Sequence, residues 1–473
     1  MIKCPAFQRL LHRAITSQTL RILTTCIFFY LAPVGHSAAN TEISTSEFER
    51  ALDLIEQTQL EIFINYPPAS TDDVLTELQH RLNSTDYPTS SISDTSREIT
   101  IMRELLSETI DKYDDQYANY ISPSQLKAYG ERRSGSYVGV GVKFRSVTDD
   151  YPLVIGPLLG GPLEHSNIKP GDRLIAIDDT DLKGYTTSKV TQRLKGSPDS
   201  TFRLSVRRDK QQHTIISSRR AVDLHYARSK LLANNVGYLK ISRFGGNTHT
   251  RVERLLKALI AQGISSVVLD LRDNPGGSTR AARAVVSMFS KEPRIYCEQY
   301  KSGDTRQLPR HGPHITDLPL TVLVNGESKS SAEIVAGALQ GYKRALIIGS
   351  PTFGKGLVQR VFKLAEPIGG ALRTTIAMFG TPSAGLIHGN GIAPDYYIET
   401  DADFMFRESG SLNISDEARQ YQRQLREARV RKKYKDSDRA KAERLITAED
   451  KQLQAAIDIL TKKNVGLRSS KSK

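Results

Sequence analysis

The sequence predicts a mixed α/β fold, and three observations support this prediction. From Val236 onward, short apolar runs rich in β-branched residues alternate with amphipathic stretches, which is the pattern of an α/β core. Residues 136–208 contain glycine-interrupted and alternating apolar runs that are typical of a compact β-rich domain. Polar helical patterns lie on both sides of these two regions. With 473 residues, the chain is long enough for two or three domains with cores of their own.

The N-terminal region is predicted to be mainly helical. Residues 41–80 have a helical pattern, and residues 83–96 are rich in Ser, Thr, Pro and Asp, which predicts a linker. Residues 99–129 are expected to be helical or irregular. The apolar residues that share one face of the first pattern are Phe48, Leu52, Ile55 and Leu60.

The β-rich region and the core can be divided into elements. The β-rich region contains a glycine-interrupted strand over 136–144, a turn at Lys169-Pro-Gly-Asp-Arg-Leu174 followed by a strand, a helix over 187–194 and a strand over 201–207. The core elements are, in order, strand 237–241, helix 248–262, strand 266–271, helix 278–290, strand 320–324 and helix 330–340. Near the C-terminal end, residues 452–460 predict a helix whose apolar face docks on the rest of the molecule.

The formal net charge of +14 raises the question of a nucleic-acid partner. The excess basic residues lie partly at the two ends, including the run from Arg423 to Lys435. No zinc-finger spacing and no aromatic RNA-binding signature accompany them, so a solvated basic helix is the better interpretation. Attraction to an acidic lipid surface remains open. The ten histidines are scattered, so the sequence predicts no metal site.

The first 39 residues have the features of a secretory signal. Basic residues precede an apolar stretch from Ile22 to Val34, and Ser37-Ala-Ala39 offers a small-residue cleavage site. The basic region is long, so an uncleaved membrane anchor is an open alternative. Cleavage would remove Cys4 and Cys26 and leave Cys297 as the one cysteine. An exported protein without disulfides fits the periplasm of a Gram-negative bacterium.

Two side chains, Ser330 and Lys355, carry the chemical prediction. A serine hydroxyl is a weak nucleophile and needs a base nearby. Lysine is a base only when neutral, which requires lowering its pKa from about 10.4 by roughly three units. Burial away from carboxylates lowers a lysine pKa in this way. Taken singly, each residue has a simpler interpretation, since Ser330 could cap a helix and Lys355 could lie in a solvated turn.

A glycine-rich turn follows a buried strand at Asn274-Pro-Gly276-Gly277. Glycines let backbone amides approach a developing negative charge, as in an oxyanion hole, although a simple strand-to-helix turn would have the same residues. A phosphate-binding loop competes for Lys355, because Gly349 and Gly354 have the required spacing. However, Gly356 stands where that loop needs Ser or Thr for magnesium, and a strand-like run follows, so nucleotide hydrolysis is disfavoured.

These motifs together resemble the carboxyl-terminal processing peptidases, also called tail-specific proteases, over roughly residues 100–400. In that family a catalytic lysine follows the serine by twenty-five positions, and the same spacing separates Ser330 from Lys355. Ser328 and Ser331 do not fit this spacing. Lys329 and Ala332 depart from the family pattern, and Gly341 stands where an acidic residue is common.

The resemblance implies roles for individual residues. Ser330 would be the nucleophile, Lys355 the base, and Gln359 a third member that orients the lysine, although four residues of straight strand span about 13 Å. The amides of Gly276 or Gly277 and of Ser331 would bind the oxyanion. The β-rich region resembles a PDZ domain, in which the amides around the following residues bind a chain-terminal carboxylate: Gly139, Val140 and Gly141.

The resemblance also implies an architecture and an activity. We expect a crotonase-like α/β protease core over 211–400 with an inserted PDZ domain over 136–210. A helical region over 40–135 and a basic helical region over 401–473 flank them. The expected activity is cofactor-independent cleavage of proteins with unstructured C-terminal tails in the periplasm, by a serine endopeptidase. Family members suggest cell-wall hydrolases as substrates, a helical-repeat lipoprotein as adaptor, and homo-oligomers. The alternative is a tail-binding protein of the same fold that does not cut.

Overall fold

The computed structural model describes residues 46–58, 71–84, 94–113, 115–398 and 450–461, with single positions between 415 and 424. The predicted signal segment and Leu60 lie outside the described residues. Among the helices of the described ranges, none has the length and apolar character needed to cross a bilayer.

A largely parallel sheet forms the centre of the core. Its strand order is β10-β11-β12-β15-β16-β20, in which β10 runs antiparallel to β11 and the other pairs are parallel. Every residue of β11, β12 and β15 is buried, as expected for parallel strands covered on both faces. The strands are β10 (Ala227–Leu231), β11 (Val236–Ile241), β12 (Ser266–Asp270), β15 (Leu320–Val324), β16 (Leu346–Gly349) and β20 (Tyr396–Tyr397), and a short 3₁₀ turn (Ala233–Asn235) joins the first two.

Helices cover the two faces of this sheet. One face packs against α6 (Thr248–Ala261), α7 (Thr279–Phe289) and α8 (Ser331–Gly341) in the largest apolar cluster of the described chain. The other face packs against α11 (Lys451–Leu460), where Ala456 meets Tyr238 and Leu323. The predicted docking of the C-terminal helix is therefore confirmed, as are the core strands and helices predicted from the sequence.

A second, mostly antiparallel sheet lies on the outer side of α8. Its strand order is β1-β18-β13-β14, and β17 and β19 also pair with β18. Helix α8 is apolar on all sides and nine of its eleven residues are buried, because α7 and both sheets surround it. The strands are β1 (Asn119–Ile121), β13 (Arg294–Tyr300), β14 (Thr305–Pro309), β17 (Leu357–Lys363), β18 (Ala371–Thr381) and β19 (Gly385–Leu386).

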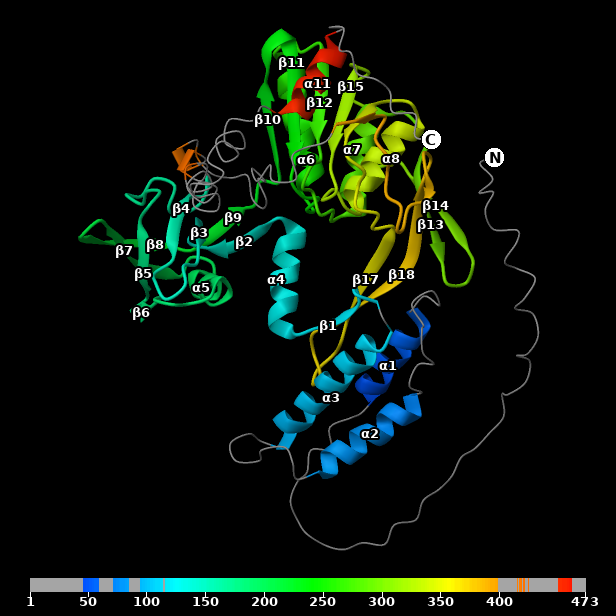
Figure 1. Ribbon diagram of the computed structural model, residues 1–473. Coiled ribbons are helices and arrows are strands. Elements are labelled where there is room, and N and C mark those ends of the chain that lie inside the picture. The colour runs from blue at the N-terminus through cyan, green and yellow to red at the C-terminus, as the bar shows by residue number, and fades with distance from the viewer. Residues whose placement is uncertain are drawn as a thin grey trace, which may run out of the picture.

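The N-terminal helices pack beneath the hairpin formed by β17 and β18 (Figure 1). These helices are α1 (Ser46–Thr58), α2 (Thr71–Asn83) and α3 (Asp94–Asp111). Phe48, Leu52 and Ile55 are buried, which confirms their predicted apolar face. Helix α3 begins at Asp94, so the last three residues of the predicted linker, 94–96, belong to the first turn of this helix.

The β-rich domain stands to one side of the core, joined to it by α4 (Pro123–Ser134) and a ribbon of β2 (Ser136–Gly139) and β9 (Arg220–Asp223) (Figure 1). The predicted strand over 136–144 is in fact two strands in different sheets, since the chain turns at Gly141 with a φ of 75°. The sheet of the domain runs past residue 210, because β8 pairs with β7 along its length. Its elements are β3 (Val142–Arg145), β4 (Leu153–Pro157), β5 (Arg173–Ile177), β6 (Thr180–Asp181), α5 (Thr187–Leu194), β7 (Thr201–Arg208) and β8 (Gln211–Ser218).

Candidate active site

Three loops meet at the carboxyl ends of parallel strands β12, β15 and β16. The loop after β12 carries Gly276 and Gly277, the loop after β15 carries Ser330, and the loop after β16 carries Lys355. Neighbouring parallel strands present their carboxyl ends at the same edge of a sheet, which is where α/β proteins place their sites. Segments separated by about eighty residues of sequence are brought together in this way.

Ser330 has the backbone conformation of a residue held under strain. Its φ and ψ are 55° and −116°, a region that side-chain-bearing residues rarely occupy, immediately before the first turn of α8. The neighbouring serines are used structurally. Ser328 Oγ donates to the Leu271 carbonyl at 2.9 Å, and Ser331 Oγ donates to the Gly277 carbonyl at 3.0 Å. The Ser330 hydroxyl donates to no carbonyl among the described residues, so of the three it is the one whose proton is left for chemistry.

The carboxylate of Glu333 joins the serine and lysine loops. Glu333 is fully buried, and its Oε2 accepts the Ser330 amide at 2.7 Å and the Lys355 amide at 2.9 Å. Its Oε1 accepts the Gly354 amide and the Thr352 hydroxyl, both at 2.6 Å. Burial raises the pKa of Glu333, while these four donors oppose the rise. One side chain therefore fixes both candidate catalytic backbones relative to each other.

The Lys355 side chain is half-buried, and its surroundings favour the neutral amine. Burial lowers its pKa to about 8, and the positive charges of Arg373 and Lys329 contribute to the lowering. Asp115 and Glu333 oppose it. At pH 7 roughly a tenth of such a lysine is neutral, against less than a thousandth for a lysine with its ordinary pKa.

In this arrangement the Lys355 ammonium lies over an aromatic ring. Its Nζ is 4.0 Å from the centroid of Tyr117. Within the described residues, no hydrogen bond joins Lys355 Nζ to Ser330 Oγ. The two candidate catalytic side chains thus share an anchored backbone, but their functional atoms are not paired here.

Gln359 does not reach Lys355 in this arrangement either. Its Nε2 donates to Thr375 Oγ1 of β18 at 3.3 Å. Gln359 lies in β17, which leads away from the Gly354-Lys355-Gly356 turn, and a register shift at Val358/Gln359 is too small to turn the chain back. The strand after Lys355 also confirms the prediction that no helix follows it, which argues against a phosphate-binding loop.

The glycine turn after β12 lies directly against the serine. A Cβ added at Gly276 would come 2.8 Å from Ser330 Cβ, so only glycine allows this approach. The Gly276 amide already donates to Asn274 Oδ1 at 2.9 Å. The amides of Gly277 and Ser331 have no hydrogen-bond acceptor in the described part of the chain. Of the predicted pair of glycines, Gly277 is therefore the one with an available donor.

A buried ionic cluster holds the base of the glycine turn. Asp270 is fully buried and accepts hydrogen bonds from Arg272 and from the Tyr238 hydroxyl at 2.7 Å each. Burial alone would raise the pKa of Asp270, but the charges of Arg272 and Lys240 lower it. Arg272 also makes two hydrogen bonds to Asp450, at 2.7 and 2.8 Å, at the start of α11. The C-terminal helix is thus tied to the turn that carries the candidate oxyanion donors.

The β-rich domain presents a sheet edge and a glycine loop. β3 pairs with β4 alone among the described strands, so its outer edge lacks a strand partner. In the loop before it, the Val140 amide donates to the Leu194 carbonyl at 3.2 Å. Burial raises the pKa of the Tyr137 hydroxyl, and the nearby Gly141 amide opposes the rise. One of the predicted carboxylate-binding amides, that of Val140, is therefore already in use.

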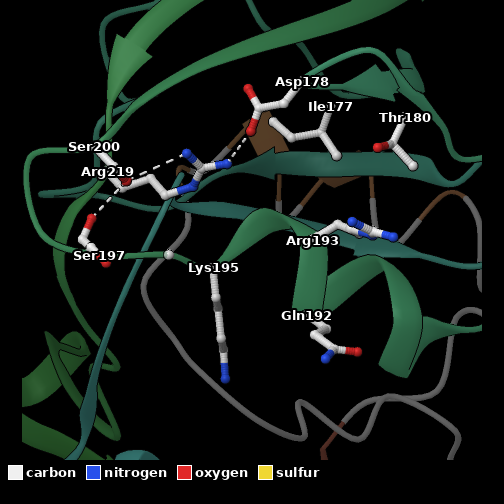
Figure 2. A pocket seen from close by; sticks show the side chains of 10 residues that line it. Ile177, Asp178, Thr180, Gln192, Arg193, Lys195, Ser197, Ser200 and Arg219 are labelled. Atoms are coloured by element: carbon white, nitrogen blue, oxygen red, sulfur yellow. Dashed lines mark hydrogen bonds and ion pairs between the residues drawn. The ribbon is translucent and has the colours of Figure 1, made fainter.

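A separate hollow of about 550 Å³ lies at the end of α5 in the same domain. Arg219 bonds to Asp178 and Ser200 on one of its walls, and Lys195 points away from them (Figure 2). Lys195 instead pairs with Glu131 of α4. None of the predicted carboxylate-loop residues lines this hollow, so it is a different feature from the expected peptide site.

Sequence reasoning assigned no role to Glu333, Tyr117 or Arg373. A signal for Glu333 was present, because it stands three residues after Ser330, the position of a capping-box acid. Tyr117 reaches the site through the pairing of β1 with β18, which no local pattern predicts. In the described ranges, no group of three His, Cys, Asp or Glu side chains is placed to hold a metal ion.

Comparison with known proteins matches two regions of this chain to described families. Residues 235–398 match the model of peptidase family S41, and residues 138–216 match a PDZ domain. The photosystem II D1 C-terminal processing protease is similar in structure, with 24% identity and a TM-score of 0.46, over 75% of this chain and 93% of that one.

Curated relatives carry consistent names. A carboxyl-terminal-processing protease of Picosynechococcus sp. is 34% identical over 298 residues, which is 62% of this chain and 72% of the relative. The protein of the same name from Synechocystis sp. is 30% identical over 62% of this chain and 70% of its own length. A probable CtpA-like serine protease of Staphylococcus aureus is 27% identical over 68% of this chain and 64% of its own length. This chain belongs to the carboxyl-terminal-processing proteases of peptidase family S41, serine-type peptidases that here carry a PDZ domain.

Proposed function

We propose that this protein is a Ser-Lys endopeptidase in which Ser330 is the nucleophile and Lys355 the general base. The main support for this proposal is that the Glu333 carboxylate accepts hydrogen bonds from the backbone amides of both residues. A half-buried lysine whose pKa is about 8 has the amine population that such a base requires. No other serine of the loop has a hydroxyl without a structural bond among the described residues.

The proposed reaction begins when the Lys355 side chain turns from the Tyr117 ring to Ser330. Ser330 Oγ attacks the scissile carbonyl carbon as its proton passes to Lys355 Nζ. The oxyanion forms against the amides of Gly277 and Ser331, which need no reorganisation to receive it. Collapse of the tetrahedral intermediate breaks the C–N bond, and Lys355 returns the proton to the leaving amine. Water then attacks the acyl carbon as Lys355 accepts its proton, and the ester C–O bond breaks as Lys355 returns that proton to Ser330 Oγ.

Substrate capture is proposed for the PDZ domain. An extended tail would add as a strand to the edge of β3 that pairs with no described strand, and its terminal carboxylate would meet the loop at Gly139, Val140 and Gly141. The Val140 amide donates to the Leu194 carbonyl, so this bond must be released before Val140 can bind a carboxylate. Gln359 is proposed as an orienting residue that Lys355 meets once it turns toward Ser330.

We place the activity in the periplasm, on the basis of the apolar segment from Ile22 to Val34 and the small-residue site at Ser37-Ala-Ala39. Cell-wall hydrolases with unstructured tails are proposed as substrates, with a helical-repeat lipoprotein adaptor and a homo-oligomeric assembly. These proposals rest on the family, and pull-down with a Ser330→Ala trap from a periplasmic extract identifies the proteins that accumulate.

The direct test is cleavage of an unfolded protein that ends in an apolar tail. Ser330→Ala and Lys355→Ala are each expected to lower the rate by about 10³-fold or more while circular dichroism remains unchanged. Amidating the C-terminus of the substrate should raise KM with little change in kcat. Full activity in either purified variant would overturn the assignment, and an inert wild type that still binds the tail would favour a non-cutting binding protein.

A further inference from the structure

Among the described residues, Lys355 Nζ contacts the Tyr117 ring and makes no hydrogen bond with Ser330 Oγ. The 4.0 Å distance to the ring centroid is a close cation–π contact. The Tyr117 amide donates to Asp115 Oδ1 at 2.9 Å, so ring and carboxylate belong to one small turn. Asp115 is 5% exposed, and its other oxygen, Oδ2, has no hydrogen-bond partner in the described chain.

This turn favours the charged form of the lysine. An aromatic face attracts an ammonium ion and offers little to a neutral amine. A buried carboxylate with an unsatisfied oxygen acts in the same direction, and Asp115 raises the pKa of Lys355. The protonated lysine is the form that cannot accept the proton of Ser330. The turn therefore opposes the function proposed for Lys355.

Other groups that face Lys355 act in the opposite direction. Arg373 on β18 and Lys329 in the serine loop repel a positive charge, while Glu333 on α8 attracts it. His388, in the loop after β19, lies near enough for Lys355 to lower its pKa, although burial is the larger cause. The lysine thus lies between groups that favour its charged form and groups that favour its neutral form.

The turn is held firmly by the core. Arg373 Nε donates to the Tyr117 carbonyl at 2.9 Å, and β1 pairs with β18 from Asn119 onward. The backbone that carries the ring is therefore fixed, whereas the long Lys355 side chain has four rotatable bonds with which to move.

We propose that Tyr117 and Asp115 are positioning residues that hold Lys355 in a protonated resting position, which the lysine leaves when it turns toward Ser330. This inference rests on the proposed Ser-Lys mechanism. The cradle, meaning the Tyr117 ring with the Asp115 carboxylate, stores the lysine in a form that cannot act as a base. Cleavage then requires Lys355 to lose its proton and to leave the Tyr117 ring.

The test lowers the electron density of the ring face while the ring itself stays nearly the same size. Tyr117 is replaced by phenylalanine and then by phenylalanines carrying one, two and three ring fluorines, which progressively weaken a cation–π contact. The acid limb of the kcat/KM profile should move to lower pH along the series, by up to about one unit in total. Asp115→Asn should move it in the same direction. The same series at Tyr120, whose hydroxyl bonds to the Gly369 carbonyl, is the control and should leave the limb in place.

A second readout separates this inference from the proposed function. In a Ser330→Ala background nothing is cut, and the Lys355 amine is titrated by NMR with ¹³C at its Cε. A midpoint that falls with each added fluorine supports the cradle even if no substrate is ever cleaved. A midpoint that stays constant across the series at Tyr117 overturns the cradle, whether or not Ser330 proves to be the nucleophile.

Discussion

Two places in this molecule present backbone amides to an anion, and they differ in readiness. Beside Ser330, the amides of Gly277 and Ser331 have no acceptor among the described residues and are held by glycine-rich packing. In the PDZ loop, the Val140 amide already donates to the Leu194 carbonyl, and the Gly141 amide lies near the Tyr137 hydroxyl. On our proposal, the oxyanion site would be prepared before substrate arrives, whereas the carboxylate site would have to exchange one of its own bonds for the ligand.

The difference follows from what each site binds. An oxyanion exists only in the transition state, so donors that are already in place act on the rate. A tail carboxylate is present in the ground state. Amides that already donate within the protein therefore weaken its binding, and they favour ligands whose hydrogen bonds are stronger than those that the protein gives up. On this proposal, the core holds the prepared catalytic site and the PDZ domain holds the site that must rearrange.

The largest expected effect comes from breaking the element that prepares the catalytic site. Glu333→Gln places an amide NH₂ where one carboxylate oxygen accepted two donors, so two buried hydrogen bonds are lost at a cost of about 2–5 kcal/mol. We expect kcat/KM to fall at least about 100-fold and the unfolding temperature to fall, measured with a tailed substrate and by calorimetry. Glu327→Gln, a more exposed change in the same loop, is the control. Full activity in Glu333→Gln would show that the two backbones need no common anchor.

The second effect is the pH dependence of the prepared site. The pKa of Lys355 is lowered to about 8, and only the neutral amine acts as a base. Activity should therefore rise with pH through about 8 and level off above about pH 9, with kcat/KM about 100-fold below its plateau at pH 6. Steady-state rates in buffers of constant ionic strength give the profile. An acid limb centred below pH 6 would contradict a lysine base.

The third effect concerns the restrained site. Tyr137→Phe removes a hydroxyl that lies near the Gly141 amide, so a tail carboxylate no longer competes with it for that amide. We expect tighter binding of a free-acid tail peptide, by several-fold, since one neutral hydrogen bond contributes about 1 kcal/mol. Fluorescence anisotropy with Ser330→Ala protein measures it, with an amidated peptide as reference. Tyr151→Phe, which alters a tyrosine bonded to Asp181 in the same domain, should change nothing. Weaker binding in Tyr137→Phe would mean that the hydroxyl supports the loop and does not block it.

The two sites also differ in how far the sequence predicted them. Helices α6, α7 and α8 and strand β12 follow from apolar periodicity, and the twenty-five-residue spacing, through the resemblance to the family, led to the proposed pair Ser330 and Lys355. Local pattern and spacing carry no information on the third dimension, which is why the contact of Lys355 with Tyr117 was not predicted. The contacts of the PDZ loop were not predicted for the same reason, since the turn at Gly141 brings the amide of this residue near the Tyr137 hydroxyl.

The smallest expected effect tests the electrostatic part of the catalytic site. Lys329 departs from the family pattern, and its Nζ lies 3.8 Å from the centroid of the exposed Phe353 ring and 3.3 Å from Glu327. Its charge lowers the pKa of Lys355, so Lys329→Ala should raise that pKa and move the acid limb upward by a few tenths of a pH unit. Salt should reduce the shift, because a partly exposed charge is screened. Lys343→Ala, an exposed change beyond α8, should leave the limb unmoved. A downward shift in Lys329→Ala would mean that its main action on Lys355 is not charge repulsion, and the readiness of the catalytic site would then depend on burial and Arg373.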